Sequence, residues 1–215
     1  MPDRKILLVE GSDDEHVIKH ICGTRNVGVL NIKTQGSVES LLDGFPVRLK
    51  ESDIEALGLV LDADLNLAGR WAGLRQRLAT SGYIGIPENP EPVGTILTPP
   101  PNTLLPRFGV WLMPDNRSEG ILEDFLRFVI PAGSELFEHA RTSVAQIPDG
   151  HRLFTEGDLP KALIHTWLAW QSEPGRPFGT AITARFLDPT VAEVDVLVAW
   201  LRRLYFPTSA AGVAG

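Results

Sequence analysis

Two short apolar runs that each end in carboxylates constrain the fold of this 215-residue chain more than any other feature. Residues 6–9 lead into Glu10, and residues 59–61 lead into Asp62. An apolar run that ends in acid is typical of an interior strand in a parallel sheet. Open α/β sheets place their ligand sites at the carboxyl ends of the strands. We therefore expect these acids to lie at one edge of a sheet.

Helical patterns alternate with the strand patterns in the first part of the chain. Strands are predicted at residues 5–9, 27–32 and 57–61, and an amphipathic helix follows each of them. This order indicates a parallel sheet with right-handed crossovers. We expect Ser12 and Glu15 to cap the first helix, Gly44 and Pro46 to break the helix over residues 37–50, and Gly82 to end the third helix.

The rest of the chain is predicted to be a loop, one more strand and a set of helices. Residues 87–106 contain seven prolines, which leaves room for one short strand at residues 94–98. A strand over residues 108–113 then ends before Asp115, and Ser118 is expected to cap the next helix. Further helices are predicted at residues 134–145, 159–171 and 190–205.

These patterns predict an α/β fold, with a mostly parallel central sheet flanked by helices and a helical C-terminal third. We expect an α/β core over residues 1–130, a helical extension packed on it over residues 131–206, and a flexible tail over residues 207–215.

The composition is that of an ordinary globular protein. Hydrophobic residues make up 43% of the chain and charged residues 22%, so a sizeable core is expected. No apolar run approaches the roughly 20 residues that span a bilayer, so no membrane partner is expected. Cys22 is the only cysteine, which excludes an internal disulfide. A cytoplasmic location is the default expectation, since no signal-peptide pattern follows the N-terminus.

The net charge of −7 argues against simple electrostatic capture of nucleic acid. Two bound divalent cations would offset this by about +4 at an acidic site. The basic groups, Arg70, Arg75 and Arg77 with Arg202 and Arg203, are expected to be solvated helix faces rather than a phosphate-binding groove.

The first acidic cluster contains one residue that helix capping does not explain. Asp13 and Asp14 lie where a helix begins, and negative charge is favourable there. Glu10 instead ends the strand, so a capping account leaves it without a role. Carboxylates that converge at one edge repel one another unless a divalent cation lies between them. The cluster therefore indicates a magnesium-type site.

The second cluster is an Asp-x-Asp pair formed by Asp62 and Asp64. Alternate residues of an extended segment point the same way, so both carboxylates are expected to reach one cation. An EF-hand is excluded, because Leu67 and Gly73 replace its glycine and its bidentate glutamate. The alternative is an acidic turn that leads into a helix.

A further acidic pair, Glu123 and Asp124, lies on the helix that follows the strand at residues 108–113. Consecutive helical residues are about 100° apart, so only one of the two is expected to face a site. Glu123 flanks the predicted buried stripe. The alternative for both residues is a solvated face.

The sequence motifs resemble those of the Toprim domain, which topoisomerases, bacterial primases and OLD-type nucleases share. Residues 10–14 follow the pattern Glu-Gly-x-x-Asp, and the Asp-x-Asp pair follows at residues 62–64. A second acid four residues after the glutamate is most similar to the OLD type. Segments 111–116 and 120–124 also resemble a small stand-alone Toprim-related family of unassigned function. Segments 167–171, 179–182 and 200–201 resemble the C-terminal part of that family.

The resemblance implies phosphoryl or phosphodiester chemistry on nucleic acid or a nucleotide, with one or two Mg²⁺ (or Mn²⁺) ions. Every implied ligand is a hard oxygen, which favours magnesium over zinc. Lys161 is the candidate for the lysine that OLD-type nucleases use near their metals, and its alternative is an exposed helix lysine. The implied metal ligands are Glu10, Asp14, Asp62, Asp64 and Glu123, and the implied catalytic residues are Glu10 and Lys161.

Two functions follow from these observations. The first is a metal-dependent, nuclease-like hydrolase. The second is a non-catalytic Toprim-like module that binds a partner protein or nucleic acid, and the acidic net charge and the absence of an accompanying ATPase domain favour it. The joint presence of five acids at suitable positions favours the first function, by a narrow margin.

Overall fold

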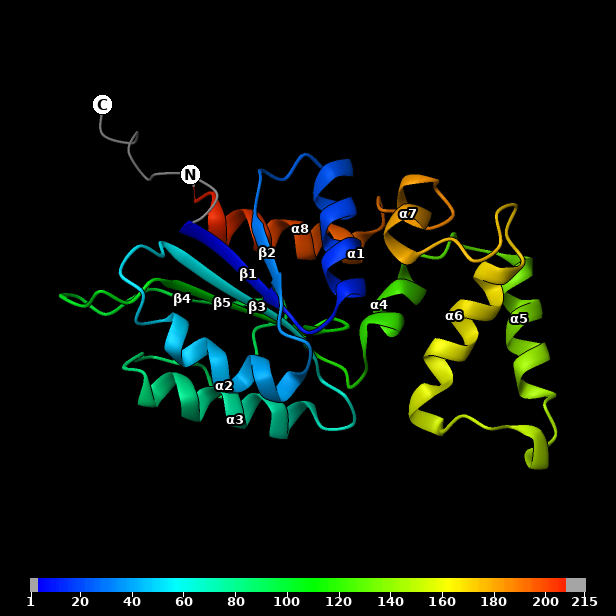
Figure 1. The fold of residues 1–215 in the computed structure, drawn as a ribbon, viewed down its shortest axis with the longest axis horizontal. Helices are drawn as coiled ribbons and strands as arrows, with labels where there is room; N and C mark the ends of the chain where they lie inside the picture. The colour runs from blue at the N-terminus through cyan, green and yellow to red at the C-terminus, as the bar shows by residue number, and fades with distance from the viewer. Residues whose placement is uncertain (1–3, 208–215) are drawn as a thin grey trace.

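The computed structural model describes residues 4–207 and shows a five-stranded sheet between two layers of helices (Figure 1). The strand order is β2-β1-β3-β5-β4, in which only the edge strand β4 is antiparallel to its neighbour. The expected α/β class with a mostly parallel sheet is confirmed. Residues 208–215 of the predicted tail lie outside the described part. The strands are β1 Lys5–Val9, β2 Asn31–Thr34, β3 Ala56–Asp62, β4 Thr95–Leu97 and β5 Arg107–Met113.

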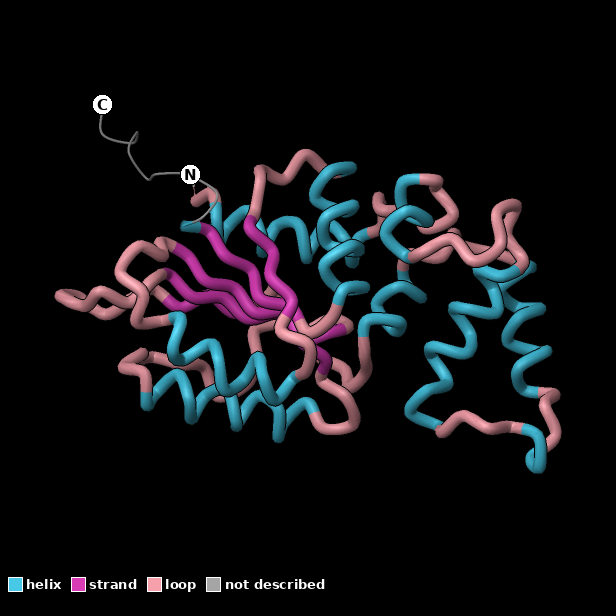
Figure 2. Tube along the Cα trace, in the orientation of Figure 1, coloured by secondary structure: helices cyan, strands magenta, loops and turns pink. Residues whose placement is uncertain are grey.

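Helices α1 and α8 cover one face of the sheet, and α2 and α3 cover the other (Figure 1). Helices α5 and α6 form a hairpin that projects from this layered body, and Figure 2 shows it well apart from the strands. No helix within residues 4–207 has the length and apolar character that a bilayer crossing requires. The helices are α1 Ser12–Thr24, α2 Val38–Arg48, α3 Leu67–Thr80, α4 Leu122–Phe128, α5 Glu135–Ala145, α6 Leu159–Ala169, α7 Phe178–Thr183 and α8 Ala192–Tyr205.

The apolar strands supply both faces of the sheet with core side chains. Leu7 and Val9 of β1 pack into the cluster that includes α1 and α8, whereas Ile6 and Leu8 pack into the cluster that includes α2 and α3. Side chains alternate between the two faces along a strand, so a strand covered on both faces is apolar at every position. This explains why the run before Glu10 is uninterrupted.

Helix α8 belongs to this core although it comes last in the chain. Trp200 packs against Trp111 of β5 with ring centroids 5.8 Å apart, and its Nε1 donates to the Thr95 carbonyl at 3.2 Å. The Tyr205 hydroxyl donates to the Ile6 carbonyl at 2.7 Å. The division at residue 130 stays a prediction, but one face of the sheet depends on a helix from the C-terminal segment.

The start of α1 differs from the prediction. Gly11, in an extended conformation, is the N-cap residue, and its N–H donates to the Asp14 carboxylate at 3.0 Å. The expected Ser12–Glu15 capping box is therefore wrong, since Ser12 is already the first helical residue. Glu15 instead pairs with Lys19 one turn later.

Two further element boundaries were predicted wrongly in the first half of the chain. The second strand begins at residue 31 rather than 27, because Asn26 has a φ of 50° and the Val27 N–H turns back to the Cys22 carbonyl. Helix α2 is continuous through Gly44 and Pro46. Pro46 lies in its last turn and cannot donate a backbone hydrogen bond, and the helix ends two residues later.

The helix after β5 also begins later than predicted, and one helix was missed. Ser118 donates to Asp115 within a turn, and Ile121 is the N-cap residue of α4. Helix α7 spans only residues 178–183 and is too short for a periodic pattern. It packs closely on α1, since a Cβ at Gly179 would lie 2.9 Å from the His16 carbonyl oxygen.

Candidate metal centre

The carboxyl ends of β1, β3 and β5 lie side by side and bring the first two candidate acids together. Val9 is in register with Val60, and Asp62 is in register with Met113. The Asp62 N–H donates to Glu10 Oε1 at 3.0 Å. Glu10 and the Asp-x-Asp segment are therefore in direct contact across neighbouring strands.

Two more acids reach this edge from the first turns of α1 and α4. Asp14 and Glu123 are the only charged residues that are buried within residues 4–207. One Asp14 oxygen accepts from the Gly11 N–H. In α4 the neighbouring Asp124 takes the capping role by accepting from Ile121 N–H at 3.1 Å, and it pairs with an arginine on the outside. Glu123, rather than Asp124, is thus the interior member of its pair.

Asp64 is held at the edge by a different arrangement. Its backbone exchanges two hydrogen bonds with Gly120, at 2.9 and 2.8 Å, which ties the Asp-x-Asp segment to the loop before α4. Its φ of 53° is left-handed, so the segment is not extended there, and the expectation based on alternating directions does not apply. Its carboxylate forms an ion pair with Arg70 of α3.

The acids act on one another electrostatically. The pKa of Asp62 is raised to about 8, chiefly by burial and then by the charges of Asp14, Glu10, Asp64 and Glu123 in that order of size. Burial also raises the pKa of Asp14 to about 6, with Glu10 and Glu123 adding to the shift and the Gly11 N–H opposing it. The other four candidate metal ligands therefore lie close enough to Asp62 to affect its ionisation.

Basic side chains border the acids on two sides. Burial raises the pKa of Glu10, against the Asp62 N–H and Arg70, which lower it. Burial likewise raises the pKa of Glu123, against Lys161 and His165 of α6.

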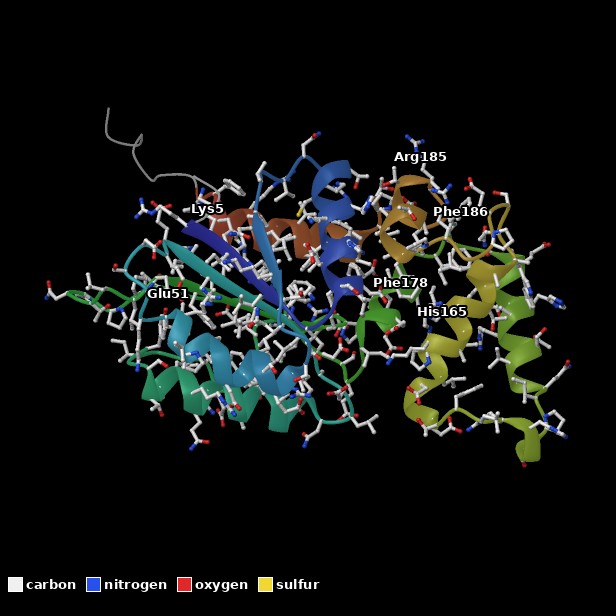
Figure 3. All side chains as sticks on the ribbon, viewed as in Figure 1. Lys5, Glu51, His165, Phe178, Arg185 and Phe186 are labelled. Atoms are coloured by element: carbon white, nitrogen blue, oxygen red, sulfur yellow. The ribbon has the colours of Figure 1, made fainter. Side chains whose placement is uncertain are left out.

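Lys161 and His165 lie one turn apart on α6. Lys161 is exposed and lies 4.0 Å from Asp158, which is a weak contact. The His165 ring packs on Phe178 with centroids 4.9 Å apart, and Figure 3 shows the two side chains at the junction of α6 and α7. Helix α6 thus presents two basic side chains toward the acidic edge.

A cleft of about 800 Å³ opens beside the acids. Its walls come from residues 63–73 after β3, from residues 119–124 around the start of α4, and from residues 155–161 at the base of α6. Asp64, Arg70 and Lys161 all line it. A cleft of this volume is in the range of small-molecule and cofactor sites.

The carboxylate oxygens at this edge fit a hard divalent cation in their chemistry, although they are not arranged around a single point. Within residues 4–207, no three His, Cys, Asp or Glu side chains are arranged to hold a metal ion simultaneously. However, Asp62 Oδ1 is buried without a hydrogen-bond partner in the described structure. Carboxylate oxygens are the ligands that Mg²⁺ and Mn²⁺ prefer, and a cation here would both satisfy Asp62 and relieve the mutual repulsion.

Two residues at this site were not expected to function there. Arg70 was predicted to be part of a solvated helix face, but its side chain is only 16% exposed and contacts Asp64. The available signal was its position in the first turns of the helix that follows the Asp-x-Asp pair. His165 carried no signal, since only the approach of α6 to α4 places it near Glu123.

A family model described as "Protein of unknown function (DUF3226)" matches residues 4–206. No curated protein and no solved structure matches the chain.

Proposed function

This chain belongs to the family described as "Protein of unknown function (DUF3226)", and we propose that it is a divalent-metal-dependent, nuclease-like phosphodiesterase that acts on nucleic acid or a nucleotide. One observation carries the proposal. At a single sheet edge, burial and the charges of four neighbouring carboxylates raise the pKa of Asp62, and one Asp62 oxygen is buried without a hydrogen-bond partner in the described structure. The resemblance of the motifs to Toprim domains supports the same chemistry.

The proposed site consists of metal ligands and of a lysine in the cleft that faces the phosphate. Glu10 and Asp62 form the central pair of ligands, with Asp14, Asp64 and Glu123 around them. When bound, Mg²⁺ or Mn²⁺ supplies activation of water and stabilisation of the leaving oxygen. Lys161 lines the cleft and interacts with Glu123, so it is placed to offset the negative charge of a phosphate. The proposed metal ligands are Glu10, Asp14, Asp62, Asp64 and Glu123.

Alanine substitution of Glu10 or Asp62 tests the proposal. We expect Mn²⁺-dependent hydrolysis of bis(p-nitrophenyl) phosphate and of single-stranded DNA to fall at least about 100-fold in either variant, because each loses a central ligand. Saturable heat on Mn²⁺ titration should disappear as well. Glu51→Gln is the control: Glu51 lies before the amino end of β3, at the far end of the sheet in Figure 3.

Equal hydrolysis by wild type, Glu10→Ala and Asp62→Ala would refute the catalytic assignment. Activity that falls equally in the Glu51→Gln control would show a general loss of fold instead, and circular dichroism of each variant separates these cases.

One observation favours the second candidate, a module that binds a partner protein. The loop between α5 and α6, at the end of the projecting hairpin, exposes 95% of the Leu153 side chain. Such a module would give no saturable Mn²⁺ heat in the wild type. In either case we place the protein in the cytoplasm, where the single buried Cys22 stays a free thiol.

A further inference from the structure

Arg70 is a cation of α3 that contacts the acidic edge. Its guanidinium forms an ion pair with Asp64, and its charge also lowers the pKa of Glu10. Asp64 is in turn one of the charges that raise the pKa of Asp62. Arg70 therefore partly neutralises the acids that a metal ion would neutralise.

The other side of the same guanidinium belongs to the cleft. Arg70 lines the cavity of about 800 Å³ together with Lys161, which lies across it on α6. Arg70 Nε is buried and has no hydrogen-bond partner in the described structure. The ion pair with Asp64 thus leaves one guanidinium donor, the buried Nε–H, without a partner, while the residue itself lines the cleft.

These two roles compete for one side chain. The Arg70 guanidinium competes with a metal ion for the Asp64 carboxylate, because the two cations repel each other at close range. Guanidinium binds phosphate as well as carboxylate through paired N–H donors. Release from Asp64 would therefore leave Arg70 ready to bind a phosphate.

We propose that Arg70 is a counter-ion that exchanges partners: it holds Asp64 before the metal binds, and afterwards it binds a phosphate group of the substrate in the cleft. This inference rests on the proposed metal-dependent function and adds to it the residue that recognises the phosphate. According to this inference, Arg70 weakens the binding of the metal ion and strengthens the binding of the substrate.

Arg70→Gln tests the exchange because its two expected effects have opposite signs. The Kd for Mn²⁺, measured by calorimetry, should fall about three- to tenfold, since a competing positive charge is removed. Binding of inorganic phosphate to the Mn²⁺-loaded protein should weaken at least about tenfold, since its guanidinium donors are lost. A merely structural Arg70 would weaken both, or neither.

Two further variants complete the test. Arg77→Gln is the matched control, because Arg77 lies on the same helix and borders the same cleft but pairs with the exposed Asp43 at 3.5 Å. It should leave the Mn²⁺ affinity unchanged. Arg70→Lys keeps the charge but not the paired donors, so its Mn²⁺ affinity should stay near that of the wild type while phosphate binding weakens.

The outcomes separate this inference from the function on which it rests. Equal Mn²⁺ affinity in the wild type and Arg70→Gln, or phosphate binding that Arg70→Gln leaves intact, would overturn the partner exchange and leave the metal site standing. Absence of saturable Mn²⁺ heat in both proteins would overturn the two proposals together.

Discussion

At the scale of single residues, Asp62 connects the site to the stability of the fold. Its folded-state pKa of about 8 lies above the ordinary value of 3.8, because burial and four neighbouring acids disfavour its charged form. The protonated carboxyl therefore stabilises the folded state fully below about pH 4, and this contribution is lost as the pH rises toward 8.

Asp62→Asn should remove this pH dependence. An amide cannot ionise, so in EDTA the stability of the variant relative to the wild type should increase by about 3–4 kcal/mol between pH 5 and pH 8. Chemical denaturation at the two pH values measures the difference. Asp14, with a pKa of about 6, will leave a smaller decline in both proteins.

The exposed Asp43 provides the control for this experiment, since Asp43→Asn removes an acid that is 80% exposed. If the wild type and Asp62→Asn lost the same stability between pH 5 and pH 8, the burial of an ionisable Asp62 would not be the cause. Added Mn²⁺ should stabilise the wild type more than Asp62→Asn, because the variant lacks a charged ligand.

At the scale of the elements, the helices that follow β1 and β5 serve the fold and the site at once. Each begins beside a strand end, and each uses an aspartate in its first turn to accept a backbone N–H, Asp14 in α1 and Asp124 in α4. In α1 the capping aspartate is itself a candidate ligand. In α4 the role is divided, since Asp124 caps while Glu123 faces the acids. Local capping therefore explains part of each acidic cluster but not its inward-facing members.

The contact between β3 and α8 gives a prediction at this scale. At Gly58 a Cβ would lie 2.3 Å from the Tyr205 hydroxyl and 2.9 Å from Leu7, so Gly58→Ala should destabilise the protein by about 2–3 kcal/mol through overpacking. Thermal or urea denaturation checks this value.

Gly23→Ala is the opposite case with the same chemical change. Gly23 lies in the last turn of α1, and a Cβ there would have nothing within 4 Å. Alanine should stabilise the helix by about 0.5–1 kcal/mol. Equal effects of the two substitutions would contradict the close approach of α8 to the sheet.

At the scale of the whole molecule, the last helix in the chain completes the layer that covers one face of the sheet. Helix α8 buries Trp200 and Leu201 against a face that the strands of the N-terminal half provide. A chain that ends at residue 190 would leave this face uncovered, so we expect it to lose cooperative thermal unfolding and to bind a hydrophobic dye. Calorimetry and dye fluorescence measure both effects.

Deletion of the loop at the end of the α5–α6 hairpin, residues 149–154, is the contrasting change. This loop contains exposed residues such as Leu153 and lies away from the sheet. Its replacement by a short glycine–serine linker should leave the cooperative transition in place. Loss of cooperativity in this variant, or its retention in the chain ending at residue 190, would contradict the role assigned to α8.

The sequence alone predicts the order of the strands and helices, apart from the short helix α7, and it places acids at the strand ends. Both are local properties, because they follow from the spacing of apolar residues over a few turns or strand positions. It also predicted which member of the Glu123–Asp124 pair lies inward, since the buried stripe of a helix has a regular period. Boundaries such as the start of β2 were less predictable, because a turn at Asn26 rather than hydrophobicity decides them.

Only the tertiary structure decided which distant segments meet. Three contacts join segments that no sequence period links. They are the ion pair of Arg70 with Asp64, the approach of Lys161 to Glu123, and the packing of α8 on the sheet. The physical reason is that these contacts depend on how whole layers pack, and packing selects among faces that look equally solvated in the sequence. Arg70 illustrates this, since its helix position alone is typical of a surface arginine, and the neighbouring strand end makes it part of the site.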